Sequence, residues 1–192
     1  MKRLTLLAGI AAAIVSTALP ASAADYVFDI KGQHASIGFR VKHLGYSWLT
    51  GRFDKFDGTF SYDPANPAAS KVSVEIDTAS ISSNHAERDK HLRGPDYLDS
   101  EAYPKATFVS TEVIPEGDNK AKIKGNFTLR GVTKEVVLDM ERMGGGPDPW
   151  GGQRMGFTGT AKLTIADFGF KKQLGPASTE AELFLDVEGV QK

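Results

Sequence analysis

The segment 84–93 holds the side chains best suited to chemistry, two histidines among arginines and an aspartate. On a helix, His85, Arg88 and Asp89 share one face because they are three and four residues apart. His91 lies six residues after His85 and points elsewhere, whereas two histidines that bind one metal from a helix are best placed four residues apart. We therefore predict a charged helix that forms ion pairs with loops. A second interpretation stays open, in which these polar groups lie at a cavity mouth and contact a ligand's head group.

The other two histidines, His34 and His43, flank a predicted strand over 35–41. They lie at its opposite ends and, by parity, on opposite faces, so a metal site that uses both is not expected. The chain has no cysteine, which excludes thiol catalysis, thiolate metal ligands and disulfides. It also lacks a Gly-x-Ser-x-Gly nucleophile, a His-Glu-x-x-His pair and a phosphate-binding glycine-rich loop. We predict no catalytic residue, no metal site and no cofactor.

Most of the remaining chain alternates apolar and polar residues with period two, which is typical of half-buried strands. The predicted strands are 26–30, 35–41, 52–62, 72–77, 106–113, 123–129, 136–140, 157–165 and 183–187. In the strand 52–62, Phe53 is out of phase with Phe56 and Phe60, which indicates a bulge. Turn signals at 116–119, 130–131 and 144–147 are short, and short connections favour antiparallel neighbours.

This pattern predicts an all-β antiparallel fold, either a closed barrel or a two-sheet sandwich. The length of the strands and the small residues on their inward faces favour the barrel; these residues are Gly38, Gly58, Gly125, Gly159 and Ala161. The helix over 84–93, capped by Ser82, Ser83 or Asn84 and stopped by Gly94-Pro95, is expected at one end. A barrel of eight strands is either just filled by side chains or able to hold one small ligand, and both remain open. Trp150, in a glycine-rich loop, is either a lid over a barrel end or a packed loop anchor.

The N-terminus has the three-part pattern of a secretory signal. Lys2 and Arg3 precede an apolar core over 4–19, and Pro20 and Ala21-Ser22-Ala23 follow. The core is shorter than the roughly 20 apolar residues that span a bilayer. We predict a signal peptide over 1–23, cleaved after Ala23, and one exported domain over 24–192.

The predicted mature chain is weakly charged. The signal carries two of the 23 basic residues and no acidic residue, which leaves 21 basic and 24 acidic residues and a net charge of −3. This balance argues against nucleic acid and against an anionic membrane surface as partners. No stable membrane insertion is expected, and the sequence leaves open a homodimer.

Blocks of residues along the whole mature chain resemble the YceI-like family. They are Gly32–Ala35 with Phe39, His43–Trp48, Gly51-x-Phe53-x-x-Phe56-x-Gly58, Asn84–Arg93, Tyr103–Phe108, Leu129–Lys134, Asp148–Gly152 and Leu174–Ser178. The resemblance is to the periplasmic, proteobacterial branch. It implies an extended, lipocalin-like, eight-stranded antiparallel barrel with a long apolar interior and the short helix near its opening. It also implies a polyisoprenoid or other long lipid as ligand, and no known catalytic residue.

We therefore predict a periplasmic binding or carrier protein, not an enzyme, that holds a polyisoprenoid, an isoprenoid quinone or a similar lipid. The predicted lining is Phe39, Phe60, Val74, Ile76, Phe108, Phe127, Phe157, Leu163 and Ile165, with His85, Arg88, Asp89, His91 and Trp150 at the rim for the head group. A slip of one residue would exchange the inward and outward sets. The alternatives are a hydrolase-like or metal-dependent enzyme that uses the segment 85–91, and a packed, stress-protective exported protein without a ligand.

Overall fold

The computed structural model describes residues 23–172 and 175–192. The predicted signal peptide therefore lies outside the described residues apart from Ala23. Within the described part, no helix combines the length and apolar character that crossing a bilayer requires.

The elements are β1 (Ala24–Phe28), β2 (Ala35–His43), β3 (Ser47–Phe53), β4 (Phe56–Tyr62), β5 (Lys71–Asp77), β6 (Ile81–Ser82), α1 (Ala86–Arg93), β7 (Lys105–Glu116), β8 (Lys120–Leu129), β9 (Val132–Pro147), β10 (Gln153–Thr164) and β11 (Glu180–Gln191), with 3-10 turns at Pro67–Ala69, Thr78–Ser80 and Ile165–Phe168.

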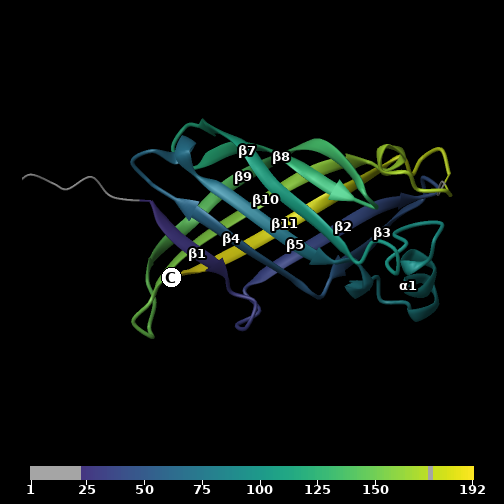
Figure 1. Ribbon diagram of the computed structural model, residues 1–192, viewed down its shortest axis with the longest axis horizontal. Coiled ribbons are helices and arrows are strands. Elements are labelled where there is room, and N and C mark those ends of the chain that lie inside the picture. The colour runs from purple at the N-terminus through teal and green to yellow at the C-terminus, as the bar shows by residue number, and fades with distance from the viewer. Residues whose placement is uncertain (1–22, 173–174) are drawn as a thin grey trace, which may run out of the picture.

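The strands form one closed antiparallel barrel, elongated along its axis (Figure 1). The hydrogen-bonded ring runs β1-β4-β5-β7-β8-β9-β10-β11 and returns to β1, which confirms the predicted eight-stranded barrel. β11 pairs with β10 from end to end on one side. On its other side, residues 181–187 pair with β2 and residues 189–191 pair with β1. Because both edges of β11 are used, the barrel has no seam along this strand.

Three positions in the wall are each filled by two strand segments. β1 and β2 lie in line beside β11, β3 and β4 lie in line next to them, and β5 and β6 follow. The break between β3 and β4 is bridged by two backbone bonds: the Asp54 N–H donates to the Ser80 carbonyl at 3.1 Å, and the Asp77 N–H donates to the Lys55 carbonyl at 3.0 Å. The predicted single strand over 52–62 with a bulge is therefore wrong. The phase slip at Phe53 marks a two-residue interruption, after which Phe56 restarts the alternation.

The later strands are longer than the sequence pattern predicts. β9 runs through the glycine segment that was expected to be a turn, and the chain turns only at 148–152. Hydrogen bonding to β10 holds this segment extended, with Gly144 opposite Gly156 and Pro147 opposite Gln153. The composition favoured a turn, but the ladder with the neighbouring strand decided the conformation.

The predicted helix is present as α1 at one end of the barrel (Figure 1). Its N-cap is His85, whose Nδ1 accepts the Arg88 N–H at 3.2 Å, rather than one of the three residues expected from the sequence. Residues 83–104 and residues 165–172, which follow β10, lie together at this end of the barrel, which we call the helical end.

Two glycines let aromatic rings lie flat against the inner wall. A methyl group at Gly58 would lie 2.6 Å from the Phe28 ring, and one at Gly125 would collide with the Phe108 ring and lie 2.7 Å from the Val109 carbonyl oxygen. The sequence predicted small residues on the inward faces. The structure shows that rings of neighbouring strands fill the places at Gly58 and Gly125, and that the Met140 side chain does so at Gly159. The prediction for Gly38 was wrong, because Ile37 and Phe39 on either side of it line the cavity and Gly38 faces outward.

Replacing Gly125 by alanine should therefore lower the free energy of unfolding by about 1–3 kcal/mol, the usual cost of overpacking. Gly144→Ala is the matched control, because a methyl group there meets no atom within 4 Å. Urea denaturation of both variants measures the difference. Equal stability of the two variants would contradict the close approach of Phe108.

Candidate ligand-binding cavity

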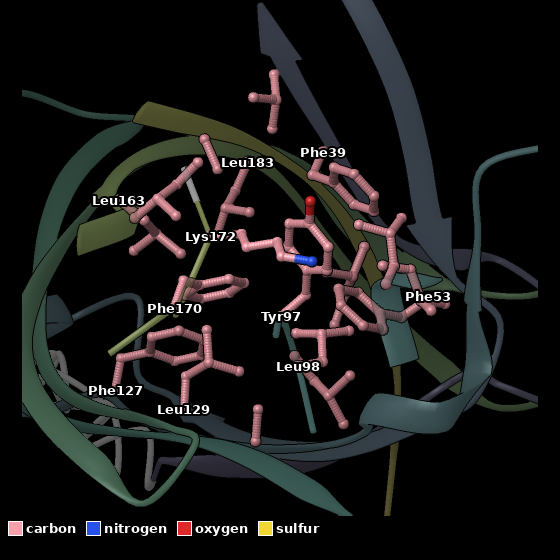
Figure 2. Close-up of a pocket in the computed structure, with 18 residues that line it drawn as sticks. Phe39, Phe53, Tyr97, Leu98, Phe127, Leu129, Leu163, Phe170, Lys172 and Leu183 are labelled. Atoms are coloured by element: carbon pink, nitrogen blue, oxygen red, sulfur yellow. The ribbon is translucent and has the colours of Figure 1, made fainter. Parts of the chain in front are cut away.

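The barrel interior contains a cavity of about 110 Å³ at the helical end, shown in Figure 2. Its lining is almost wholly apolar. It consists of Ile37, Phe39, Val41, Phe53, Ile76, Ile81, Leu92, Tyr97, Leu98, Ala106, Phe127, Leu129, Leu163, Ile165, Phe170, Lys172, Ala181 and Leu183. Tyr97 and Lys172 bring a hydroxyl and an ammonium group to this lining (Figure 2). The Lys172 side chain is 64% exposed, so it marks the side where the cavity reaches solvent.

Three further cavities continue this space toward the opposite end. A second cavity of about 90 Å³ shares Ile37, Ile76, Phe127, Leu163 and Leu183 with the first. A third of about 70 Å³ shares Phe28, Val72, Ile123, Met140 and Val187 with the second. A fourth of about 60 Å³ shares Tyr62, Ile123, Met140 and Phe157 with the third, and reaches the β7–β8 turn. Neighbouring cavities thus share walls along the barrel axis.

The mouth of the first cavity is held by Arg130, a buried residue in the β8–β9 turn. Its guanidinium donates to the carbonyl oxygens of Pro95 and Tyr97. It also lies 5.8 Å from the ring centroids of both Tyr103 and Phe170. One side chain therefore fixes the loop that carries Tyr97 and the segment that carries Phe170.

An ion pair closes the same rim. Lys172 Nζ lies 2.7 Å from Asp96 Oδ2, and the Lys171 and Lys172 N–H groups both donate to the Asp96 carbonyl. The hydrogen bond to Asp96 raises the pKa of Lys172, and the same bond lowers the pKa of Asp96. The rim therefore carries a fixed ammonium group beside the Tyr97 hydroxyl, while the wall below offers only apolar surface. Such a site can bury a chain and hydrogen-bond its polar end.

All nine apolar residues predicted as lining border the cavities. Phe39, Ile76, Phe127, Leu163 and Ile165 line the first, Val74 and Phe108 line the second, and Phe60 and Phe157 line the third. The inward register assigned from the alternation therefore agrees with the structure. Ile165 reaches the first cavity from a 3-10 turn rather than from a strand.

The polar residues predicted for the rim do not line these cavities. Ser83 donates to buried Asp89 through its N–H, at 2.8 Å, and through its hydroxyl, while Arg88 donates to the Ser83 hydroxyl and carbonyl. Burial alone would raise the pKa of Asp89, but the bonds from Ser83 and the charges of Arg93 and Arg88 together hold the pKa below its usual value. These contacts anchor the start of α1. His85 caps the helix and His91 is exposed.

Trp150 lies at the end opposite α1, in the β9–β10 turn, and its side chain is 77% exposed. The structure therefore does not bring Trp150 and α1 to one rim.

Sequence reasoning missed the residues that form the rim of the first cavity, which are Tyr97, Phe170 and Lys172. The phenylalanines after β10 offered a signal, because two such residues within three positions outside a strand still need burial.

Asp29, His34 and Glu188 form the group of possible metal ligands within the described residues, also at the end opposite α1. Arg154 occupies the space between the carboxylates, at 2.6 Å from Asp29 Oδ2 and in contact with Glu188. It also pairs with Asp148 at 2.9 Å, and His34 Nδ1 lies 2.9 Å from Asp29. A guanidinium already supplies the positive charge that a metal would bring, so the arrangement fits an ion-pair network.

Comparison with known proteins identifies the family. A model of the YceI-like domain matches residues 28–189. The chain belongs to the YceI-like family. It is 55% identical to a UPF0312 protein of Vibrio cholerae over 192 residues, which covers all of both chains.

Solved structures share the fold of this YceI-like chain. The Campylobacter jejuni YCEI protein has a TM-score of 0.71 and 31% identity, over 79% of this chain and 90% of that one. A polyisoprenoid binding domain from Saccharophagus degradans has a TM-score of 0.61 and 16% identity, over 89% of this chain and all of that one. The second likeness shows the fold alone.

The Arg154 network predicts a specific pH dependence of stability. Hydrogen bonds from Arg154, His34 and the Gly32 N–H hold the pKa of Asp29 well below its usual value near 3.9. The folded state therefore releases the Asp29 proton more readily than the unfolded state. The contribution of the Asp29 carboxylate to the free energy of unfolding is complete when the pH is above that usual pKa. The contribution is lost as the pH falls below it.

Asp29→Asn should lower the free energy of unfolding at neutral pH and flatten its decline between about pH 5 and pH 2. Urea denaturation at a series of pH values measures the slope. Asp118→Asn, in the exposed β7–β8 turn, is the control and should follow the wild-type curve. An unchanged slope in Asp29→Asn would contradict the assignment.

Proposed function

We propose that the protein binds one long apolar chain, of the polyisoprenoid or isoprenoid-quinone class, inside its barrel and carries it through the periplasm. The observation that supports this most is the series of four cavities that share walls along the barrel axis, of which the first three are lined mainly by apolar side chains. A series of narrow spaces suits a thin, flexible chain better than a compact ring or a polar molecule. The likeness in fold to a polyisoprenoid binding domain agrees with this ligand class.

Burial of apolar surface provides the affinity. Each buried CH₂ contributes about 0.8 kcal/mol before ordering costs, so a chain of tens of carbons binds with few polar contacts. Strands of 12 residues, such as β7, β10 and β11, extend about 40 Å, which accommodates a long chain along the axis. The polar end of the ligand meets Tyr97 and Lys172 at the mouth. This role requires no reacting group, so the protein acts by binding and release rather than by catalysis.

The periplasmic part of the proposal rests on the N-terminal signal pattern and its cleavage after Ala23. A carrier there would move an apolar molecule through the water between two membranes. The exposed histidines of the segment 85–91 support the alternative enzyme less well, because His85 Nδ1 accepts a backbone hydrogen bond and Asp89 is used by Ser83.

Mass spectrometry of an organic extract tests the cargo. The full-length chain is expressed with its own signal and purified from the periplasmic fraction without detergent. We expect about one isoprenoid chain per protein and an intact mass that begins at Ala24. An extract without lipid from correctly processed protein would argue for the packed barrel without ligand, and bound metal with turnover would argue for the enzyme.

Filling the interior should displace the cargo. Leu163 borders both the first and the second cavity, so Leu163→Trp should reduce the extracted lipid at least about tenfold if part of the chain can no longer be buried. Thr160→Trp is the matched control, because Thr160 lies exposed on the same strand. Circular dichroism verifies that both variants are folded. Equal lipid content in the two folded variants would place the ligand elsewhere.

A further inference from the structure

The tip of the β2–β3 hairpin, residues 42–48, exposes three large apolar or aromatic side chains within five positions. Tyr46 is 87% exposed, Leu44 53% and Trp48 41%. Single exposed apolar residues are ordinary on a protein surface. Three such residues at one hairpin tip are less common, because each one leaves apolar surface in contact with water. A partner could bury this surface.

The tip lies at the helical end of the barrel, the same end as α1 (Figure 1). Val41, just before it, lines the first cavity. The Ser178 hydroxyl donates to the Lys42 carbonyl, and Leu44 lies beside Gly175. The tip therefore begins directly after a residue of the cavity wall, and contacts with Gly175 and Ser178 hold it against the segment before β11.

The charge of the hairpin has one sign. Residues 35–53 include Arg40, Lys42 and Arg52 and no aspartate or glutamate, but Arg52 pairs with Asp54 directly after the hairpin at 2.7 Å. Lys42 is therefore the basic side chain of this hairpin that no ion pair within the described residues neutralises. The Arg40 guanidinium lies 4.2 Å above the Trp48 ring and pairs with Glu182 of β11 at 2.6 Å, while Lys42 Nζ lies 5.5 Å from the same ring. Tryptophan and tyrosine are enriched at the headgroup level of bilayers, and lysine side chains reach from there to lipid phosphates.

The turn holds its leucine at the apex. Leu44 has φ 54° and Gly45 has φ 83°, and the Tyr46 N–H donates to the His43 carbonyl at 3.0 Å. Hairpin turns with two such residues favour asparagine, aspartate or glycine. A leucine at this position places an apolar group outward in a conformation that costs it energy.

The opposite end differs in charge. Trp150 is also exposed there, with its ring 5.2 Å from Arg154, but Asp29, Asp148 and Glu188 surround that arginine. Three carboxylates around one guanidinium give this cluster beside Trp150 an excess of negative charge, which disfavours contact with anionic lipid.

We propose that residues 42–48 insert into the interface of an anionic phospholipid bilayer and so hold the cavity mouth against the membrane. The weak net charge of the whole chain argued against such a surface, but the part that would meet the membrane is the tip alone, where Lys42 lies among Leu44, Tyr46 and Trp48. An apolar chain could then pass between bilayer and cavity with little exposure to water. The docking site goes beyond the proposed cargo, because it requires a membrane surface and no particular ligand.

Fluorescence of the two tryptophans tests the orientation, since the chain contains only Trp48 and Trp150. Trp150→Phe leaves Trp48 as the reporter, and Trp48→Phe leaves Trp150. With vesicles of equal parts phosphatidylcholine and phosphatidylglycerol, we expect Trp48 emission to shift to shorter wavelength and to be quenched by brominated lipid, and Trp150 emission to stay unchanged. No response of Trp48, or a response of Trp150 instead, would overturn the proposal.

Vesicle flotation tests the tip itself. The double variant Leu44→Ser, Tyr46→Ser should reduce partitioning into these vesicles at least about tenfold, since it removes two apolar anchors. Met143→Ser is the control, because Met143 is 69% exposed on β9 toward the opposite end. Equal partitioning of both variants overturns the proposal. So does a wild-type dimer without vesicles that the double variant converts to monomer, because the tip then binds a second copy.

These outcomes are separate from those of the cargo experiment. The double variant should keep the lipid content of the wild type, because neither Leu44 nor Tyr46 lines a cavity. A lipid-free extract with intact vesicle binding would refute the proposed cargo and leave the docking site standing. A protein that contains lipid but does not bind vesicles would refute the docking site and leave the proposed cargo standing.

Discussion

Hydrogen bonding along both edges of β11 is the constraint on which the rest of the structure depends. One edge pairs with β10 over its whole length, and the other is divided between β2 and β1. Closure of the eight-strand ring leaves no free edge along β11, whereas among the described residues β3 pairs on the side away from β2 only with β6, through Arg52 and Phe53. Closure also turns one face of each strand inward. The apolar face that the alternation creates thereby becomes the wall of an elongated interior.

The positions of the aromatic rings divide that interior into separate cavities. Phe28 and Phe108 cover glycines of neighbouring strands and stay against the wall, and Phe168 packs edge-on against Phe127 at 5.5 Å between ring centroids. The remaining spaces are narrow and share walls rather than forming one wide chamber. A flexible apolar chain, the proposed cargo, would match this shape and would gain its affinity from burial rather than from a set of precise polar contacts.

The two ends of the barrel have different chemistry. At the helical end, Arg130 fixes the loop of Tyr97, and Lys172 is held by Asp96. At the other end, Arg154 binds three carboxylates and holds a compact ion-pair network. The cavity at the helical end has an almost wholly apolar lining, whereas the cavity that reaches the β7–β8 turn also has Asp118, Lys120 and Arg142 in its lining.

Much of this architecture could be predicted from the sequence. Period-two alternation is local, so it identified most strands and the inward register of residues such as Phe127 and Leu163. The family blocks identified the barrel and the helix near its end. The alternation also signalled the irregularity at Phe53, but whether it was a bulge or an interrupted strand depended on pairing with β6 and β5.

Tertiary structure alone decided how the ends are built. The glycine run at 144–147 has the composition of a turn, yet pairing with β10 keeps it extended. The mouth joins Tyr97, Arg130 and Lys172, which are distant in sequence and follow no period, so no local pattern could group them. Charged side chains of α1 looked suited to a ligand, but their partners are the helix's own start. Local spacing thus determined which residues face inward, while long-range contacts determined which polar groups are left at the mouth.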